Sequence, residues 1–433
     1  MYLNLIGLLI VVMAVAQIIT LFFTIYQMLI TFSGMFKEKK RMKIAKNFTE
    51  KYALIVCAHN EAMVIGKTIH NLLDLDYPRE LYDIYVTCDN CTDDTADIVR
   101  MIGGIALERF NNKQKGKGYA LEWTFNQLWK MEDQGITYNG IAVFDADNLV
   151  SRNILKCATA KLRSGFDVIQ VYLDSKNPSD TWITKSYAYA YWVTNRNYQL
   201  ARENIGLSAQ LGGTGMIFKS SLLKEMGWGA KSLTEDLEFT VRYIIQHGKR
   251  VGWIHEAKIF DEKPLKMKQS WNQRMRWMQG HFACTIKYSG QLIRLFIKKP
   301  KLLYFDALVY LIQPTKIVLA MAGLVFYLLS LFSPLPPVIQ NWVLNPWIWF
   351  GVLLLFYLQP FVGLIMENKL SKIWWAFSTY IFSISWIPIV FIAFFRKNNT
   401  TWSHTKHTRA MNANEVLESV NTHKKRINKN KNH

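Results

Sequence analysis

Apolar and charged residues are segregated along this chain. No charged residue occurs from Met1 to Phe36, and Leu5–Met28 is almost wholly apolar. That run is longer than the roughly 20 residues that a helix needs to cross the hydrocarbon core of a bilayer. A basic cluster between Lys37 and Lys46 follows it, whereas a signal peptide carries its basic residues before the apolar run. The pattern predicts an uncleaved transmembrane helix over residues 1–36, after which the chain enters the cytoplasm.

The last third of the chain is apolar again and ends in a basic tail from Arg396 to His433. Its apolar segments lie at about Leu302–Phe332, Trp347–Met366 and Ile373–Phe395. We predict transmembrane or re-entrant helices over residues 301–396, and hence a multi-pass protein of the cell membrane. Three full crossings would leave the basic tail outside the cell, against the positive-inside rule. One segment should therefore fail to cross, and the first is the best candidate because Asp306, Pro314 and Lys316 interrupt it.

Short apolar runs alternate with helical patterns between these two regions. The runs predict strands at Tyr52–Ala58, Asp83–Cys88, Gly104–Arg109, Gly140–Phe144 and Val168–Leu173. The helical patterns lie between them, at Glu61–Leu73, Asp93–Ile102, Gly118–Met131 and Arg152–Leu162. The alternation predicts a three-layer, Rossmann-like α/β domain over residues 37–262, with a largely parallel sheet. Ligands of such domains bind at the carboxyl ends of the strands.

Composition agrees with a chain of two parts. The net charge of +20 and the mean hydropathy of +0.03 are averages over a soluble domain and apolar helices. Five cysteines in 433 residues exclude a disulfide-built scaffold, and we interpret Cys88 and Cys91 as reduced thiols. A basic excess also suits nucleic-acid binding, but that function needs the charge gathered on a soluble face. The lysine runs flank apolar segments instead, so no nucleic-acid partner is expected.

Polar residues follow the predicted strands. Glu61 comes after the first strand and Asp89 after the second. The loop Lys113–Gly118, which contains Lys117, precedes a predicted helix, so its lysines and backbone amides suit a phosphate. Each of these features also has an ordinary interpretation as loop chemistry.

The fourth strand ends in an Asp-x-Asp motif, formed by Asp145 and Asp147. Residues two apart on an extended chain point the same way, so both carboxylates can face one ion. Magnesium prefers oxygen ligands and often bridges a carboxylate to substrate phosphates. Capping of the next helix is the alternative interpretation. The place of the motif at the end of an apolar strand favours the metal site.

Two later segments also allow both a structural and a functional interpretation. Three glycines in Leu211–Lys219 lie beside an apolar strand and allow close backbone approach of a ligand. Thr234, Glu235 and Asp236 begin a helix. Thr234 suits a helix cap with acids in the first turn. In the functional interpretation, Asp236 or its neighbour is a general base in the same cleft.

Residues 263–300 predict interfacial amphipathic helices. Gln273, Arg276 and Trp277 lie within about one turn and share a helix face. An aromatic ring beside a guanidinium suits a sugar next to a phosphate. A helix on a membrane surface also carries basic and aromatic residues, and that interpretation is the stronger one for Trp271 and Arg274.

Taken in order, these motifs resemble the membrane-integrated processive family 2 β-glycosyltransferases, the cellulose, chitin, poly-N-acetylglucosamine and hyaluronan synthases. The resemblance covers about residues 50–282 closely, and the Q-x-x-R-W pattern is its most specific element. It implies a cytoplasmic GT-A catalytic domain that uses a UDP-sugar. Glu61 and Asp89 match the positions that hold the uridine, and Lys117 matches the basic residue beside the diphosphate. Asp145 and Asp147 match the metal–diphosphate motif, which implies Mg²⁺ or Mn²⁺.

The resemblance also assigns the acceptor side of the site. Asp236 matches the general base that takes the proton from the acceptor hydroxyl. Gln273, Arg276 and Trp277 match the element that binds the diphosphate and the acceptor sugar. Residues 397–433 are similar to a cytoplasmic gating loop followed by a basic tail, with the loop residues at Trp402, Thr405 and Arg409.

The resemblance predicts an inverting membrane glycosyltransferase. In this hypothesis it polymerises a β-linked exopolysaccharide from UDP-glucose or UDP-N-acetylglucosamine at the cytoplasmic face. The growing polysaccharide, its acceptor, would leave through the enzyme's own membrane helices. The alternative is a non-processive transferase that adds single sugars to a lipid or lipid-linked acceptor. The Thr-Glu-Asp sequence around Asp236 disfavours hyaluronan, whose synthases generally show Gly-Asp-Asp-Arg there.

Overall fold

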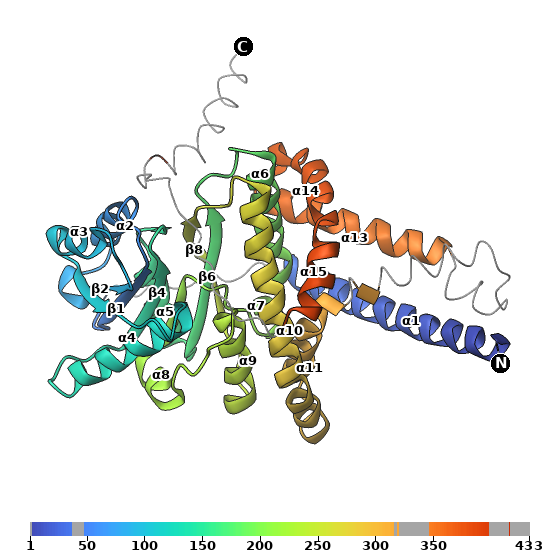
Figure 1. The fold of residues 1–433 in the computed structure, drawn as a ribbon, viewed down its shortest axis with the longest axis horizontal. Coiled ribbons are helices and arrows are strands. Elements are labelled where there is room, and N and C mark those ends of the chain that lie inside the picture. The colour runs from blue at the N-terminus through green and yellow to red at the C-terminus, as the bar shows by residue number, and fades with distance from the viewer. Residues whose placement is uncertain (1, 37–46, 316–317, 320–345, 398–414, 416–433) are drawn as a thin grey trace, which may run out of the picture.

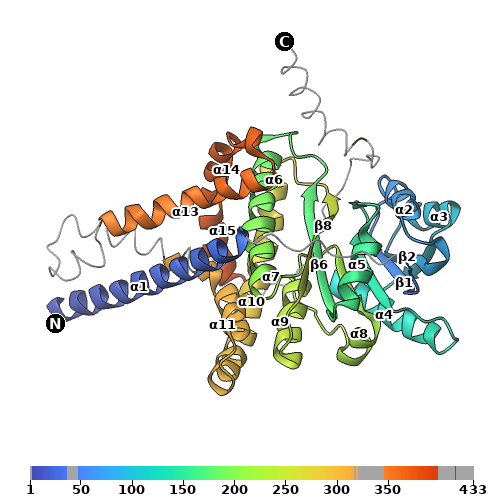
Figure 2. The ribbon, with the colours of Figure 1, turned by 180° about the vertical axis from the view of Figure 1, so that it is seen from behind.

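An α/β body carries two projecting helices. The computed structural model describes residues 2–36, 47–315, 318–319, 346–397 and 415. Helices α1 (Tyr2–Met35) and α13 (Pro346–Met366) extend from the same side of the body and lie side by side (Figures 1 and 2). The body holds the region that the strand–helix alternation predicts, together with the helices that follow it.

One sheet of eight strands forms the centre of the body, in the order β3-β2-β1-β4-β7-β6-β8-β5. The strands are β1 (Tyr52–Ala58), β2 (Tyr82–Asp89), β3 (Ile105–Arg109), β4 (Gly140–Asp145), β5 (Leu149–Val150), β6 (Val168–Ser175), β7 (Met216–Lys219) and β8 (Gly252–Asp261). Strands β1 to β4 pair in parallel, as predicted. The sheet as a whole is mixed, because β7 runs antiparallel to both β4 and β6 and β5 runs antiparallel to β8.

Helices cover both faces of the sheet, which confirms the three-layer prediction. Successive strand residues face opposite sides, so Leu54 packs in one core and Ile55 in the other. On the first side lie α2 (Ile65–Leu73), α3 (Thr95–Ile102) and α5 (Ile154–Arg163). On the second lie α4 (Lys117–Glu132), α6 (Trp182–Thr194), α8 (Ser220–Met226) and α9 (Glu235–His247). The helix predicted from Glu61 begins only at Ile65, after a turn.

A further group of helices packs against the body. Helix α10 (Met267–Lys298) is a single helix within residues 263–300, where interfacial amphipathic helices were expected. It contacts α9, α11 (Leu302–Leu311) and α15 (Trp386–Phe395), while α14 (Trp375–Ile384) packs on α6. The interpretation of Arg274 as a membrane-surface residue is wrong. Its side chain is buried, lies 4.1 Å from the ring centre of Phe382 and donates to Ser385 Oγ at 2.7 Å.

The first C-terminal apolar segment does not form a long helix in its described part. Helix α11 has ten residues and is too short to span a bilayer. Asp306 is buried within it and accepts two hydrogen bonds from Arg202, at 2.9 and 3.0 Å. Arg202 belongs to α7 (Ala201–Ile205), and Tyr26 of α1 also donates to Asp306 at 3.1 Å. The charge that interrupts the apolar pattern therefore joins three helices.

Among the described residues, two helical stretches are long and apolar enough to cross a membrane, Ala14–Met35 and Trp375–Phe395. The first agrees with the predicted N-terminal helix. The predicted multi-helix membrane region is thus not established by these helices alone. Most of 316–345 and of 397–433 lies outside the described residues.

Candidate active site

A cleft of about 420 Å³ opens at the carboxyl ends of β1, β2 and β4. It is closed on the other side by the loop 211–214, the start of α9 and one face of α10. All the predicted site residues that the structure describes line it: Glu61, Asp89, Lys117, Asp145, Asp147, Asp236, Gln273, Arg276 and Trp277. The predicted gating-loop residues Trp402, Thr405 and Arg409 lie outside the described residues.

Two asparagines shape the ends of β1 and β2. Asn60 and Asn90 have φ angles of 55° and 53°, in the left-handed region that asparagine tolerates better than most residues. Asn60 Oδ1 accepts a hydrogen bond of 2.7 Å from the backbone of Thr92, and Asn90 Oδ1 accepts one of 2.8 Å from Asn111. These contacts bind the loops after β1, β2 and β3 to one another, so the edge of the cleft is held by hydrogen bonds from backbone nitrogens to asparagine side chains.

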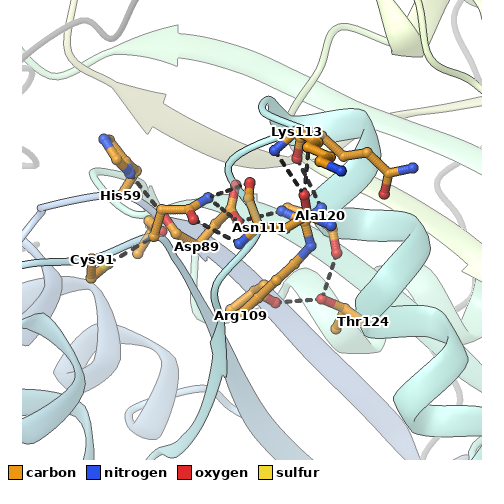
Figure 3. A network of polar contacts seen from close by, with 12 residues as sticks. His59, Asp89, Cys91, Arg109, Asn111, Lys113, Ala120 and Thr124 are labelled. Atoms are coloured by element: carbon orange, nitrogen blue, oxygen red, sulfur yellow. Dashed lines mark hydrogen bonds and ion pairs between the residues drawn. The ribbon is translucent and has the colours of Figure 1, made fainter.

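Asp89 is held by an arginine that sequence reasoning missed. Arg109, at the end of β3, is buried and forms an ion pair with the Asp89 carboxylate (Figure 3). Its other guanidinium nitrogen donates to the carbonyl of Gln114 at 2.8 Å, and His59 Nδ1 lies 2.7 Å from the Asp89 carbonyl. Burial raises the pKa of Asp89, and the guanidinium of Arg109 opposes that rise. The arginine thus ties the carboxylate to the loop that leads to Lys117.

Lys117 stands at the start of α4 and bridges two other walls of the cleft. Its ammonium group forms an ion pair with Asp145 and donates to the carbonyl of Gly213 at 2.6 Å. Burial alone would lower the pKa of Lys117, but Asp145 and the neighbouring Cys57 and Glu235 together outweigh it and hold the pKa above its usual range. Lys117 is therefore a fixed positive charge in the cleft.

The Asp-x-Asp motif is fixed in place by its surroundings. The backbone nitrogen of Asp145 donates to Asn148 Oδ1 at 3.0 Å and to Thr214 Oγ1 at 3.2 Å. The Asp147 carboxylate accepts from Asn148 Nδ2 at 3.1 Å and from the backbone of Glu262 at 2.8 Å. These contacts join the end of β4 to the end of β8.

The two carboxylates fit a divalent metal in one specific way. Within the described part of the chain, no three His, Cys, Asp or Glu side chains gather in an arrangement that could hold a metal ion. Magnesium, however, is usually bound by one or two carboxylates and completes its shell with phosphate oxygens and water. Asp145 and Asp147 supply hard oxygen ligands in the cleft. The donor set therefore suits a metal that arrives with a diphosphate.

Asp236 begins α9 together with Glu235, and both side chains line the cleft. Asp236 Oδ1 accepts a 2.8 Å hydrogen bond from the backbone of Leu237. Burial raises the pKa of Asp236. Burial, and next the charge of Asp236, raise the pKa of Glu235 to about 7. Lys117 and Arg276 oppose both shifts, so the buried Glu235 and the partly exposed Asp236 share one positively charged environment.

The α10 wall presents polar and aromatic groups. Gln273 Oε1 accepts from the hydroxyl of Tyr187 at 3.2 Å, and that hydroxyl lies 3.0 Å from Ser270 Oγ. The rings of Tyr187 and Trp277 meet edge to face with their centres 6.4 Å apart. The arrangement fixes the Gln273 side chain and gives the cleft an aromatic wall opposite the acids.

Residues 50–280, more than half of the 433-residue chain, match the glycosyltransferase-like family 2. The chain belongs to this family. The prediction of a family 2 glycosyltransferase is thereby confirmed at the level of the family, and the finer assignment to processive synthases is not.

Curated relatives of this family 2 chain are named for sugar transfer. It is 27% identical over 280 residues to the probable glycosyltransferase YdaM of Bacillus subtilis, covering 62% of this chain and 64% of the relative. It is 28% identical over 242 residues to the β-monoglucosyldiacylglycerol synthase of Synechocystis, covering 54% of this chain and 48% of the relative. The β-monoglucosyldiacylglycerol synthase of Nostoc is 26% identical, with 66% of this chain and 60% of the relative covered. The chain thus spans roughly half to under two thirds of these relatives' length.

The fold of the family 2 chain has a solved counterpart. A mannosyltransferase of Pyrobaculum calidifontis, solved with GDP-mannose and Mn²⁺, aligns with a TM-score of 0.55 and 18% identity. The alignment covers 86% of this chain and 97% of that one. The predicted GT-A-type α/β fold is therefore confirmed.

Sequence reasoning missed several residues of this family 2 cleft. Thr214 and Asn148 support the Asp-x-Asp motif, and Tyr191, Asp261 and Tyr310 line the cleft. Asp261 ends β8, and Lys263 Nζ lies 2.7 Å from its carboxylate. A place at a strand's carboxyl end would have marked Arg109 and Asp261 as candidates, but no strand was predicted at β8.

Proposed function

We propose that this chain transfers a single glucose from UDP-glucose to the hydroxyl of a membrane lipid such as diacylglycerol, with inversion of the anomeric carbon. The observation that carries the proposal is the convergence of Lys117, Asp145, Asp236 and the α10 wall on one cleft. The relatives named β-monoglucosyldiacylglycerol synthase supply the acceptor class and the sugar. They favour single addition over the polymerisation that the motif resemblance first indicated.

In this proposal Asp236 acts as the general base. Its carboxylate takes the proton of the acceptor hydroxyl while that oxygen forms a bond to the anomeric carbon from the face opposite the diphosphate. The bond between the anomeric carbon and the diphosphate oxygen breaks with its electron pair going to the diphosphate. A raised pKa makes Asp236 a stronger base, provided that it is ionised at the working pH.

The departing diphosphate carries the negative charge that the site must stabilise. Lys117 and Arg276 line the cleft on opposite walls and provide positive charge for it. A divalent cation held by Asp145 and Asp147 would supply Lewis-acid stabilisation of the same oxygens. Glu61 and Asp89 bind the uridine in this scheme, with Asp89 oriented by Arg109.

The polymer-forming alternative has one observation in its favour. Gln273, Arg276 and Trp277 line the cleft, as they would in a site for an acceptor sugar. The same wall also suits a lipid acceptor, since an aromatic ring beside polar groups accommodates a glycerol backbone. The size of the product decides between the two.

The test uses the full chain, purified in detergent, with radiolabelled UDP-glucose, Mn²⁺ or Mg²⁺ and diacylglycerol. We expect one labelled glycolipid, from which a β-glucosidase releases glucose. Material retained at the chromatogram origin, made without added lipid, would overturn the proposal in favour of a polymerase. The Asp236→Asn variant is the control for contaminating activity, and a parallel screen of other UDP- and GDP-sugars checks the donor.

A further inference from the structure

The outer face of α14 and α15 carries an apolar stripe that no contact within the described residues covers. Its members are separated alternately by three and four residues: Trp374, Phe377, Ile381, Ile384, Pro388, Phe391 and Phe395. Trp374 is 85% exposed and Phe377 is 74% exposed. Spacing of three and four residues places them all on one side of a helix.

The inner face of the same helices is bound to the body. Trp375 stacks on Trp192 of α6 with ring centres 5.6 Å apart. Phe394 meets Phe282 of α10 at 5.4 Å, and Gln279 of α10 donates to the carbonyl of Arg396 at 3.0 Å. One face is apolar because it packs on the body, and the other is apolar although it is exposed. The sequence therefore has the composition of a membrane-spanning helix along its whole length.

The helices against which α14 and α15 pack do not belong in lipid. Helix α15 lies alongside α10, because Trp386 contacts Arg274 at one end and Phe394 contacts Phe282 at the other. The start of α10 exposes Lys268 and Asn272, and its other side carries Gln273 and Arg276 in the cleft. If α15 crossed the bilayer, α10 would be drawn into the hydrocarbon with these polar groups, which is costly.

The direction of the helices agrees with this argument. Helices α1 and α13 project from the body on the side where α14 and α15 lie, and α14 and α15 run across that direction (Figures 1 and 2). Basic residues stand at both ends of the stripe, Lys372 before it and Arg396 and Lys397 after it. Such flanking cations suit the phosphates of an anionic lipid surface.

We infer that α14 and α15 lie flat on the bilayer, with the stripe immersed at the level of the upper acyl chains and the flanking cations at the headgroups. The partner of this surface is thus an anionic phospholipid bilayer rather than another protein. The stretch Trp375–Phe395 is then a surface element, although its length and composition equal those of a spanning helix.

Immersion depth tests the inference in the full chain reconstituted into vesicles of phosphatidylcholine and phosphatidylglycerol. Spin labels are placed by cysteine substitution at Phe377, Ile384 and Phe391, which follow one another at intervals of seven residues. A matched set at Val11, Ile18 and Ile25 of α1 has the same spacing and is likewise exposed. Cys57 and Cys91, the native cysteines that are not fully buried, are replaced by serine in the background.

We expect the three labels on α14 and α15 to lie within about 5 Å of one depth, just below the headgroups. The α1 labels should spread over about 20 Å, because a helix rises 1.5 Å per residue. A spread of depths on α14 and α15 equal to that on α1 would overturn the inference. Labels that are exposed to water would also overturn it, as would label spectra broadened by spin–spin contact with a second copy of the chain. The measurement needs no sugar transfer, so its result is independent of the proposed activity.

Discussion

Gly280 of α10 lies directly against Thr234, the residue that precedes the acids of α9. A β-carbon at position 280 would stand 2.5 Å from Thr234 Oγ1 and 2.8 Å from the backbone nitrogen of Thr234. Backbone atoms cannot yield as a flexible side chain does, so the absence of a side chain at Gly280 sets the distance between the α10 wall and Asp236.

We therefore expect Gly280→Ala to displace the start of α9 and lower kcat by about 10²-fold, since small misplacements of a catalytic group have effects of that size. Gly290→Ala is the matched control in the same helix, because no atom lies within 4 Å of a β-carbon there. That variant should keep full activity and gain up to about 1 kcal/mol of stability from helix propensity. Equal activity in the two variants would contradict the coupling.

Asp236→Asn should reduce glucose transfer by roughly 10²- to 10⁴-fold, because it removes the base and keeps the shape of the side chain. Binding of UDP-glucose, measured by calorimetry, should change little. Transfer within about tenfold of the wild-type rate would show that another group takes the proton, and Glu235 is the nearest such acid in sequence.

The pH profile of kcat/KM should report the two acids at the start of α9. Activity needs an ionised Asp236, and its pKa is raised, so activity should fall as the pH drops through a value above the usual range for an aspartate. Glu235→Gln removes a charge that forms only near pH 7. Because the charge of Asp236 raises the pKa of Glu235, Asp236 ionises first and Glu235 is still neutral when it does. The acidic limb of Glu235→Gln should therefore keep the position that it has in the wild type. A limb that moves to lower pH in this variant would show that Glu235 becomes charged before Asp236.

Removal of divalent metal with EDTA should abolish transfer, and added Mn²⁺ or Mg²⁺ should restore it. The double variant Asp145→Ala with Asp147→Ala should lose this response, because it removes both carboxylates of the motif. Titration of the metal against activity makes the comparison. A titration curve that is unchanged in the double variant would place the metal elsewhere.

Asp306→Ala should lower the free energy of unfolding by about 3–5 kcal/mol, because it leaves the buried Arg202 without its partner. Replacing both residues by apolar ones, with Arg202→Met and Asp306→Leu, should recover most of that loss. Lys224→Ala, which breaks a half-exposed ion pair with Glu132, is the control and should have little effect. Unfolding in detergent, followed by circular dichroism, measures all three.

The cleft residues were accessible to sequence reasoning because they follow strands. Asp89 and Asp145 end β2 and β4, which flank β1 in parallel, so the ends of the three strands meet at one edge. Arg109 gave a weaker signal, since its role depends on a partner 20 residues earlier in the chain. The contact between Gly280 and Thr234 depends on tertiary packing, which periodicity does not report.

The apolar helices are a case that the sequence alone could not resolve. A helix is apolar all round both when it crosses lipid and when it lies between protein and lipid, so composition cannot separate these cases for Trp375–Phe395. Asp306 was correctly singled out as a break in the apolar pattern. Its partner Arg202 lies 104 residues earlier and could not be inferred from spacing.

In the proposed membrane-bound enzyme, in which α1 spans the bilayer, the contacts among Tyr26, Arg202 and Asp306 fix the height of the catalytic body above the lipid. A catalytic body on a slack tether could visit hydroxyls at many heights above the lipid. Here Tyr26 of the N-terminal helix donates to Asp306, which the bidentate contact with Arg202 fixes within the body, so the mouth of the cleft stays at one height. For the proposed lipid acceptor, the distance that its hydroxyl reaches out of the membrane then becomes a criterion of specificity, separate from the chemistry of that hydroxyl.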